Sequence, residues 1–158
     1  MMTNGWPDSQ KIKKNKAMTK TLKQGVYFVK DGKPVEKYEE SVERDRLLVI
    51  GKYCKFYLSM KDLGNADFDE AQKRAASLGS DWQCPDSFQG RTMALLNSEI
   101  REKAQLLGAK WIKDVWYIWT NEEFDAVGAW DLAFRDGNLD WYIRDYGSRV
   151  CAVSAFQS

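Results

Sequence analysis

The residue types that could do chemistry are unevenly distributed over this chain of 158 residues. Histidine is absent, and the three cysteines, Cys54, Cys84 and Cys151, have no spacing typical of a metal site. Zinc sites and the Cys-His and Ser-His-Asp catalytic arrangements need histidine or clustered cysteines, so the sequence argues against all of them. We expect buried thiols, with a Cys84–Cys151 disulfide as the alternative, and neither a metal nor a cofactor.

Carboxylates offer a second kind of chemistry. Glu122, Glu123 and Asp125 lie close together near the expected end of a strand. Paired carboxylates can act as general acid and base, which keeps a carboxylate-based hydrolase as an alternative. Acidic residues beside strand ends are common on solvated surfaces, however, and we expect a protein that is not an enzyme.

Residues suited to recognition gather between Trp111 and Phe156. This stretch holds five of the seven tryptophans, with six further aromatic residues at Tyr117, Phe124, Phe134, Tyr142, Tyr146 and Phe156. It can fill a core and still leave aromatic side chains for a binding face. We therefore expect this segment to be the functional end of the molecule.

The segment from Phe124 to Phe156 also lacks four residue types. Lys, Glu, Gln and Met make up 37 of the 158 residues, yet the 33 residues of this segment contain none of them. Strand composition explains part of this, because Lys and Glu are depleted in strands. Asp and Arg remain plentiful there, and strand propensity does not easily retain Asp while removing Glu.

The chain divides into two expected regions. Residues 1–21 carry five lysines and little that is apolar beyond Trp6 and Ile12, which predicts a flexible basic tail, or alternatively a docking arm for a larger assembly. Met18 is an alternative natural start. Residues 22–158 are enough for one domain with its own core.

The first part of that domain predicts strands. Gly25–Val29 reads as a strand followed by an Asp31-Gly32 turn. Leu47–Met60 predicts a buried strand, a turn at Gly51-Lys52, and a second strand with alternating apolar residues at Cys54, Phe56 and Leu58.

Two helices are expected next. Asp67 precedes Glu70 by three residues, and Asp86 precedes Gln89 by three, which is the spacing of a capping box. The first helix would bury Phe68, Ala71, Ala75 and Leu78 and end near Gly79; the second would bury Phe88, Met93, Leu95 and Leu96. A restart at Asn97 or Ser98 would carry Ile100, Ala104 and Leu107 to a stop at Gly108.

The last part predicts strands again. Asp136-Gly137 is a hairpin signal, and Arg144–Ser148 reads as a loop. The expected strands are Val115–Thr120, Gly128–Arg135, Leu139–Ile143 and a central apolar strand, Arg149–Phe156. Strands, helices and then strands indicate an α+β fold.

Strand alternation predicts a ligand face. If Trp130, Leu132 and Phe134 point inward, then Asp131, Ala133 and Arg135 point outward. The candidate ligand-binding residues are Asp131, Arg135, Asn138, Asp140, Tyr142, Arg144, Asp145 and Tyr146. Aromatic, Arg and Asp side chains on a rigid sheet suit recognition. Replacing Tyr142, Arg144 and Tyr146 with Ala is expected to remove ligand binding and to change the melting temperature little.

Four stretches carry a resemblance to a known family. WQCPDSFQ (Trp82–Gln89) resembles the helix start W-R-L-P-T-x-x-E, and YIWTNEEF (Tyr117–Phe124) resembles Y-Y-W-S-S-T-E-Y. AWDLAFRDGNLDW and RVCAVSAF resemble the A-W-x-V-x-F-x-x-G hairpin and the closing V-R-A-V-x-A-F strand. From Leu47 to Phe156 the chain resembles the C-type-lectin-like domains of gut bacteria and their phages, including the variable proteins of diversity-generating retroelements.

The resemblance implies a C-type lectin-like fold whose first and last strands pair, with two helices packed on antiparallel sheets. It also implies a hypervariable ligand face on the carboxy-terminal strands and loops. Such retroelements mutagenise template adenines, and a diversified Asn codon ending in a pyrimidine never becomes Lys, Glu, Gln, Met or Trp. Phe124–Phe156 fits that restriction except at Trp130 and Trp141, which would be fixed scaffold positions.

The chain also departs from related families. Calcium-binding lectins of this fold use Glu-Pro-Asn or Gln-Pro-Asp with Trp-Asn-Asp, because calcium needs several oxygen ligands. The one similar Pro-Asp pair, Pro85-Asp86, falls at a helix start. Enzymes that make formylglycine have a related fold but need a reactive cysteine arrangement that Cys151 does not supply.

The expected partner is a protein or glycan ligand on a cell surface. Nearly equal basic and acidic counts, 24 and 23, argue against nucleic acid. We expect no signal peptide and no membrane span, with a virion-associated or cytoplasmic location or display at the surface through a partner. The alternative is an invariant structural or adhesion module of a virion or cell surface.

Overall fold

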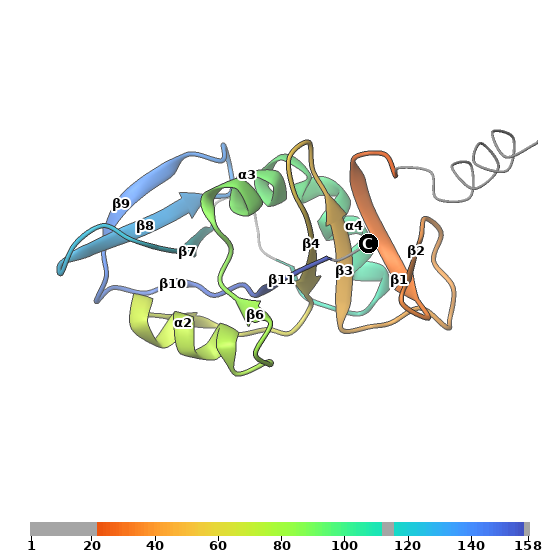
Figure 1. The fold of residues 1–158 in the computed structure, drawn as a ribbon, viewed down its shortest axis with the longest axis horizontal. Helices are drawn as coiled ribbons and strands as arrows, with labels where there is room; N and C mark the ends of the chain where they lie inside the picture. Colours follow the sequence, from red (N-terminus) through yellow and green to blue (C-terminus); the bar gives the residue numbers. More distant parts are fainter. Residues whose placement is uncertain (1–21, 112–115, 157–158) are drawn as a thin grey trace, which may run out of the picture.

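The computed structural model describes residues 22–111 and 116–156. Two sheets and three helices make up this part of the chain, which confirms the α+β class (Figure 1). The expected tail or docking arm at residues 1–21 lies outside the described residues. No helix in the described ranges is long and apolar enough to cross a membrane.

The larger sheet has six strands in the order β2-β1-β3-β4-β11-β6, all antiparallel. They are β1 (Gly25–Lys30), β2 (Lys33–Val35), β3 (Arg46–Ile50), β4 (Lys55–Ser59), β6 (Trp82–Gln83) and β11 (Val153–Ala155). The smaller sheet has five strands in the order β5-β10-β7-β8-β9. They are β5 (Asn65–Ala66), β7 (Tyr117–Glu123), β8 (Gly128–Ala133), β9 (Leu139–Ile143) and β10 (Ser148–Arg149).

The turn and hairpin predictions in the first half are confirmed. Asp31 and Gly32 both have positive φ, 52° and 76°, as a tight hairpin turn between β1 and β2 requires. β3 and β4 form the expected antiparallel hairpin, with Leu47 opposite Leu58.

The prediction that the first and last strands pair is wrong. β11 lies between β4 and β6, whereas β1 pairs with β2 and β3. All residues from Leu47 to Ile50 are buried, so β3 is covered on both faces and occupies an interior place in the sheet. The β3–β4 hairpin therefore separates β1 from β11.

Both predicted helix starts are confirmed. In α2 (Phe68–Ala76), the Asp67 side chain accepts a hydrogen bond from the Glu70 N–H at 2.8 Å. α3 (Ser87–Leu95) has the complete capping box between Asp86 and Gln89. α4 (Asn97–Leu106) follows directly, and the chain leaves it through Gly108 at φ 77°.

The buried face of α3 differs from the prediction. Met93 is fully buried, but Phe88 and Leu95 are 63% and 81% exposed. These two residues lie two turns apart on the side of the helix that faces away from the sheets. α3 approaches β8 through Gly90, where even an added Cβ would lie 3.1 Å from the Leu132 side chain.

One apolar cluster joins the two sheets. Ile118, Leu132 and Phe134, on or beside the smaller sheet, are buried with Phe56 and Leu58 of the larger one. The inward orientation of Leu132 and Phe134 is thus confirmed, whereas Trp130, which lies opposite Trp141 of β9, is only partly buried.

A second cluster covers the opposite face of the smaller sheet. It packs Phe68 and Ala71 of α2 against Trp119 and Ala129. Both faces of β8 are covered there, so the alternation of its side chains does not distinguish buried from exposed positions. Ala133, which was expected to point outward, is only 5% exposed.

Candidate functional site

A cavity of about 580 Å³ opens beside the five-stranded sheet. Its lining comes from every strand of that sheet and from the short segments beside them. The lining residues are Asn65, Trp116, Tyr117, Asp131, Asp140, Trp141, Tyr142, Gly147, Ser148 and Arg149. Its lining combines four aromatic side chains with the carboxyls of Asp131 and Asp140.

Asp131 lies at the buried end of this cavity. It sits opposite Trp119 of β7 and Asp140 of β9 in the strand register, and it is 2% exposed. The expectation that Asp131 points into solvent is therefore wrong. The reason is that β8 is an interior strand of the sheet, and the side chain of Ser148, on β10 of the same sheet, reaches the Asp131 carboxyl.

The Asp131 carboxylate is only half satisfied. The Ser148 hydroxyl donates to Asp131 Oδ2 at 3.2 Å. Oδ1 is shielded from solvent and has no hydrogen-bond partner in the described part of the chain. A buried polar atom without a partner costs free energy that a well-packed fold normally avoids.

Burial also changes the titration of this group. The pKa of Asp131 is raised to about 7, chiefly by desolvation; the Ser148 hydrogen bond opposes the rise and the nearby Asp140 carboxylate adds to it. Near neutral pH the group is therefore divided between its charged and uncharged forms. A perturbed carboxyl in a hollow is a feature of functional sites, although structural groups can share it.

Aromatic side chains form the walls. Tyr142 packs against Trp119 and Tyr146, with ring centroids 5.8 and 5.7 Å apart. The Arg149 guanidinium lies 4.7 Å from the centroid of the Trp116 ring and pairs with Asp62 at 2.8 Å. One aromatic face of the cavity thus already carries a cation of the chain itself.

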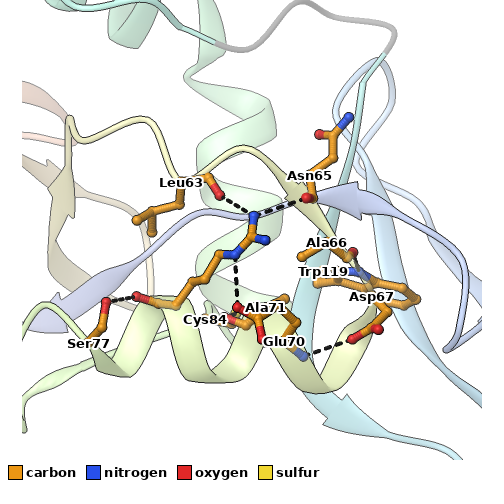
Figure 2. A network of polar contacts seen from close by, with 10 residues as sticks. Leu63, Asn65, Ala66, Asp67, Glu70, Ala71, Ser77, Cys84 and Trp119 are labelled. Atoms are coloured by element: carbon orange, nitrogen blue, oxygen red, sulfur yellow. Dashed lines mark hydrogen bonds and ion pairs between the residues drawn. The ribbon is translucent and has the colours of Figure 1, made fainter.

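A polar network holds the β5 wall in place (Figure 2). Arg74 of α2 donates to the backbone carbonyls of Leu63 and Asn65, both at 3.0 Å. The indole N–H of Trp119 donates to the Ala66 carbonyl at 2.8 Å. β5 is only two residues long, so these bonds from α2 and β7 supply much of what fixes Asn65 at the cavity.

The eight predicted site residues do not all lie at the same place in the structure. Asp131, Asp140 and Tyr142 line the cavity, and Tyr146 contacts Tyr142. Asp145 is exposed in the loop between β9 and β10. Arg135 and Asn138 instead line a second hollow of about 540 Å³ at the turn of the β8–β9 hairpin, beside α3.

Arg144 is a structural residue in this arrangement. Its guanidinium pairs with Asp69 at 2.6 Å and with Glu123 at 2.8 Å, and it lies 5.0 Å from the centroid of the Phe68 ring. The side chain is 15% exposed. Arg144 therefore ties α2 to the smaller sheet, and its replacement should now be expected to lower stability.

The three acidic residues suggested for a hydrolase each have a different partner in the fold. Glu122 accepts from the Ser87 backbone N–H at 3.2 Å, and Glu123 pairs with Arg144. Asp125 accepts from the backbone N–H groups of Val127 and Gly128 in the loop before β8. None of the three acidic residues lines the cavity.

Several lining residues were missed by sequence reasoning. Three of them lie in segments that were expected to be strands: Trp116, Tyr117 and Arg149. Nothing in the sequence around them indicates that they line a cavity. Asn65 comes from a distant part of the chain, and the pairing of β5 with β10, together with the Arg74 hydrogen bond, brings it to the site.

The cysteines behave as buried thiols. All three are free, with Cys84 and Cys151 buried and Cys54 half-buried, so the alternative disulfide is not formed. Burial raises the pKa of the Cys84 thiol to about 12 and raises the pKa of Cys151 as well. Thiols with such pKa values are poor nucleophiles.

Neither comparison with known proteins identifies this chain. No family model matches it, and no curated protein matches it significantly. In residues 22–111 and 116–156 there is also no group of three or more Cys, Asp or Glu side chains that could hold a metal ion. The geometry of the cavity is therefore the main indication of what this chain binds.

Proposed function

We propose that this chain is a non-catalytic ligand-binding module of the C-type-lectin-like kind. The cavity beside β7, β8, β9 and β10 would be its recognition site, and a protein or glycan on a cell surface would be its ligand. The observation that carries the proposal is the Asp131 carboxylate, buried in an aromatic-walled cavity with one oxygen unpartnered.

The shape of the site supports binding. Ligand pockets are concave, largely apolar and lined by a few polar groups that fix orientation, and volumes of roughly 300–1,000 Å³ are usual. This cavity, at about 580 Å³, combines four aromatic side chains with Asp131 and Asp140. Aromatic walls supply contact area at low entropic cost, and the polar groups supply specificity.

The proposal extends to diversification. The absence of Lys, Glu, Gln and Met from Phe124–Phe156 accords with a segment written by adenine mutagenesis, and this segment contributes most of the cavity lining. Under this proposal, Asp140, Tyr142 and the loop after β9 vary, while Leu132 and Phe134, which are buried, remain fixed.

Sequencing of this gene segment in its source population tests diversification. Substitutions should concentrate at codons for exposed residues such as Asp140, Asp145 and Tyr146, with Trp130 and Trp141 constant. Uniformly low variation would remove the retroelement part and leave an invariant lectin-like module.

A binding screen tests the site itself. The protein would be applied to arrays of defined glycans and purified surface proteins, alongside an Asp140→Ala variant. Asp140 is exposed, and its side chain forms no hydrogen bond or ion pair among the described residues, so the fold should persist. We expect at least a tenfold loss of binding in Asp140→Ala, and unchanged binding would remove the cavity from consideration.

A second candidate function follows from the same cavity. Asp131 and Asp140 lie opposite each other on β8 and β9, and the pKa of Asp131 is raised by burial. Two neighbouring carboxyls, one of them with a raised pKa, are a feature of glycoside hydrolases. The shielding of Asp131 Oδ1 weighs against this, because a general acid must reach the atom that it protonates. Turnover of chromogenic glycosides that is lost in both Asp131→Asn and Asp140→Asn would favour the hydrolase over the binding module.

A further inference from the structure

We propose that the cavity recognises an organic cation, an alkylammonium or guanidinium group presented by its ligand. This inference rests on the proposed binding function and names the chemistry of the ligand. It is drawn from three features of the described residues: unbalanced acidic charge, aromatic walls, and a cation of the chain itself that already occupies part of the lining.

The charge in the cavity is unbalanced. Asp131 and Asp140 lie opposite each other on β8 and β9, and neither pairs with a basic side chain among the described residues. Among the described residues, Arg149 is the one basic side chain of the lining, and it pairs with Asp62 at 2.8 Å. Two carboxylates on facing positions repel each other, and a cation placed between them would reverse that cost.

The buried position of Asp131 strengthens the attraction. Water is excluded from Oδ1, so the field of this charge is weakly screened toward the cavity. Asp140, by contrast, is exposed and can pair with a cation directly. A ligand ammonium at the cavity would then contact Asp140 and lie over the charge of Asp131.

The walls suit a cation as well. Trp116, Tyr117, Trp141 and Tyr142 line the cavity, and aromatic faces attract ammonium and guanidinium groups. Arg149 shows this interaction within the chain, since its guanidinium lies 4.7 Å from the centroid of the Trp116 ring. The other three rings have no cation against them in the described residues.

A metal ion fits this site less well than an organic cation. Calcium takes six to eight oxygen ligands, whereas the cavity offers two carboxylates among apolar rings. A neutral sugar could use the rings and hydrogen bonds, but it would leave the acidic charge unbalanced. Charge therefore favours the cation, and a neutral ligand becomes an outcome of the test.

The experiment is an NMR titration of the isotope-labelled full chain. Butylammonium chloride is the probe, 1-butanol is its neutral isostere, and sodium chloride keeps ionic strength constant. We expect saturable shifts with butylammonium and no saturation with butanol, read from the indole N–H signals of Trp116 and Trp141. Acetyl-lysine methylamide and choline then distinguish a polypeptide side chain from a quaternary headgroup as the source of the cation.

Variants locate the interaction. Asp131→Asn and Asp140→Asn keep the size of the side chain and remove its charge, so each should weaken butylammonium binding by roughly tenfold or more. Asp81→Asn is the matched control, because Asp81 is exposed and outside the cavity lining; its affinity should equal that of the parent protein.

Three outcomes would overturn the inference. They are the absence of saturable cation binding, equal binding of butanol and butylammonium, or a butylammonium affinity in both cavity variants that equals the affinity of the parent protein. Saturable binding of calcium or of methyl glycosides in place of butylammonium would overturn it in the same way. None of these results would remove the binding function, because the array screen with Asp140→Ala tests that separately. If the arrays also show no dependence on Asp140, both proposals fail.

Discussion

Asp131 combines burial with a charge that no neighbour neutralises. Its carboxyl is 2% exposed, and desolvation raises its pKa from 3.8 to about 7. The groups that face it are Asp140 on β9, Ser148 on β10, and Tyr117 and Trp119 on β7. With the folded pKa above the unfolded one, the native protein holds this proton more tightly than the unfolded chain does.

The sign of the pH effect follows from linkage. The contribution of Asp131 to stability is fully present below about pH 4 and is lost as the pH rises through about 7. Between a pKa of 3.8 and one of about 7, the loss approaches about 4 kcal/mol. Asp131→Asn should therefore stabilise the protein at pH 8 and have little effect at pH 4.

Denaturant unfolding at the two pH values measures this difference. Asp145→Asn serves as the control, because the Asp145 side chain is exposed. This substitution should change the free energy of unfolding little at either pH. A stability gain of equal size at pH 4 and pH 8 would mean that Asp131 does not titrate in this window.

At the scale of elements, β8 and β9 depend on a glycine. Gly128 lies under the Trp141 indole, and a Cβ at position 128 would overlap the ring. Gly128→Ala should displace the indole from the cavity wall and cost about 1–3 kcal/mol, as overpacking typically does. Gly147→Ala is the matched control, since a Cβ there meets nothing within 4 Å.

Tryptophan fluorescence and the melting temperature would check this prediction. Gly128→Ala should shift both, and Gly147→Ala should shift neither. An unchanged melting temperature in Gly128→Ala would show that the indole moves aside at no cost.

The α2 network allows a second test of an element. Arg74→Ala removes hydrogen bonds to the carbonyls of Leu63 and Asn65, and a loss of about 1–2 kcal/mol is expected. Lys73→Ala, its exposed neighbour on the same helix, should change stability by less than about 0.5 kcal/mol. Urea unfolding compares the two; equal effects would indicate that the network does not hold β5.

Sequence reasoning succeeded where a signal was local. The Asp67 and Asp86 caps and the Asp31-Gly32 turn each depend on residues within one turn of each other, so their spacing was sufficient. It failed where distant segments decide the outcome. The burial of Asp131 depends on β10 and Ser148, and the place of β11 depends on β4 and β6.

The same distinction applies to the candidate site. The carboxy-terminal segment was identified from its aromatic composition, and three of its predicted residues line the cavity. The ion pair of Arg144 could not be foreseen from the sequence, because its partner Asp69 lies on a helix far along the chain. A residue type that suits recognition suits a structural ion pair equally well, and only the fold distinguishes them.

At the scale of the whole molecule, the two sheets share one apolar cluster. Leu132 of the smaller sheet is fully buried with Phe56 and Leu58 of the larger one. Leu132→Ala should therefore cost about 2–5 kcal/mol and lower the stability of both sheets together. Leu95→Ala provides the control, because Leu95 is 81% exposed and should have little effect.

Thermal unfolding followed by far-UV and near-UV circular dichroism measures this coupling. One transition, shifted to lower temperature by Leu132→Ala, is expected at both wavelengths. Two separated transitions would mean that the sheets unfold independently despite the shared cluster.

The place of β11 has a consequence for the order in which the chain folds. β4 and β6 flank a strand that is synthesised last among the described elements. Until Val153–Ala155 leaves the ribosome, one edge of β4 remains open, with Phe56 and Leu58 on a strand that lacks its neighbour. Open apolar edges favour association between chains, and pairings between distant segments form slowly. The nascent protein is therefore vulnerable to aggregation until Val153–Ala155 becomes available, and slow synthesis of that segment would prolong this period.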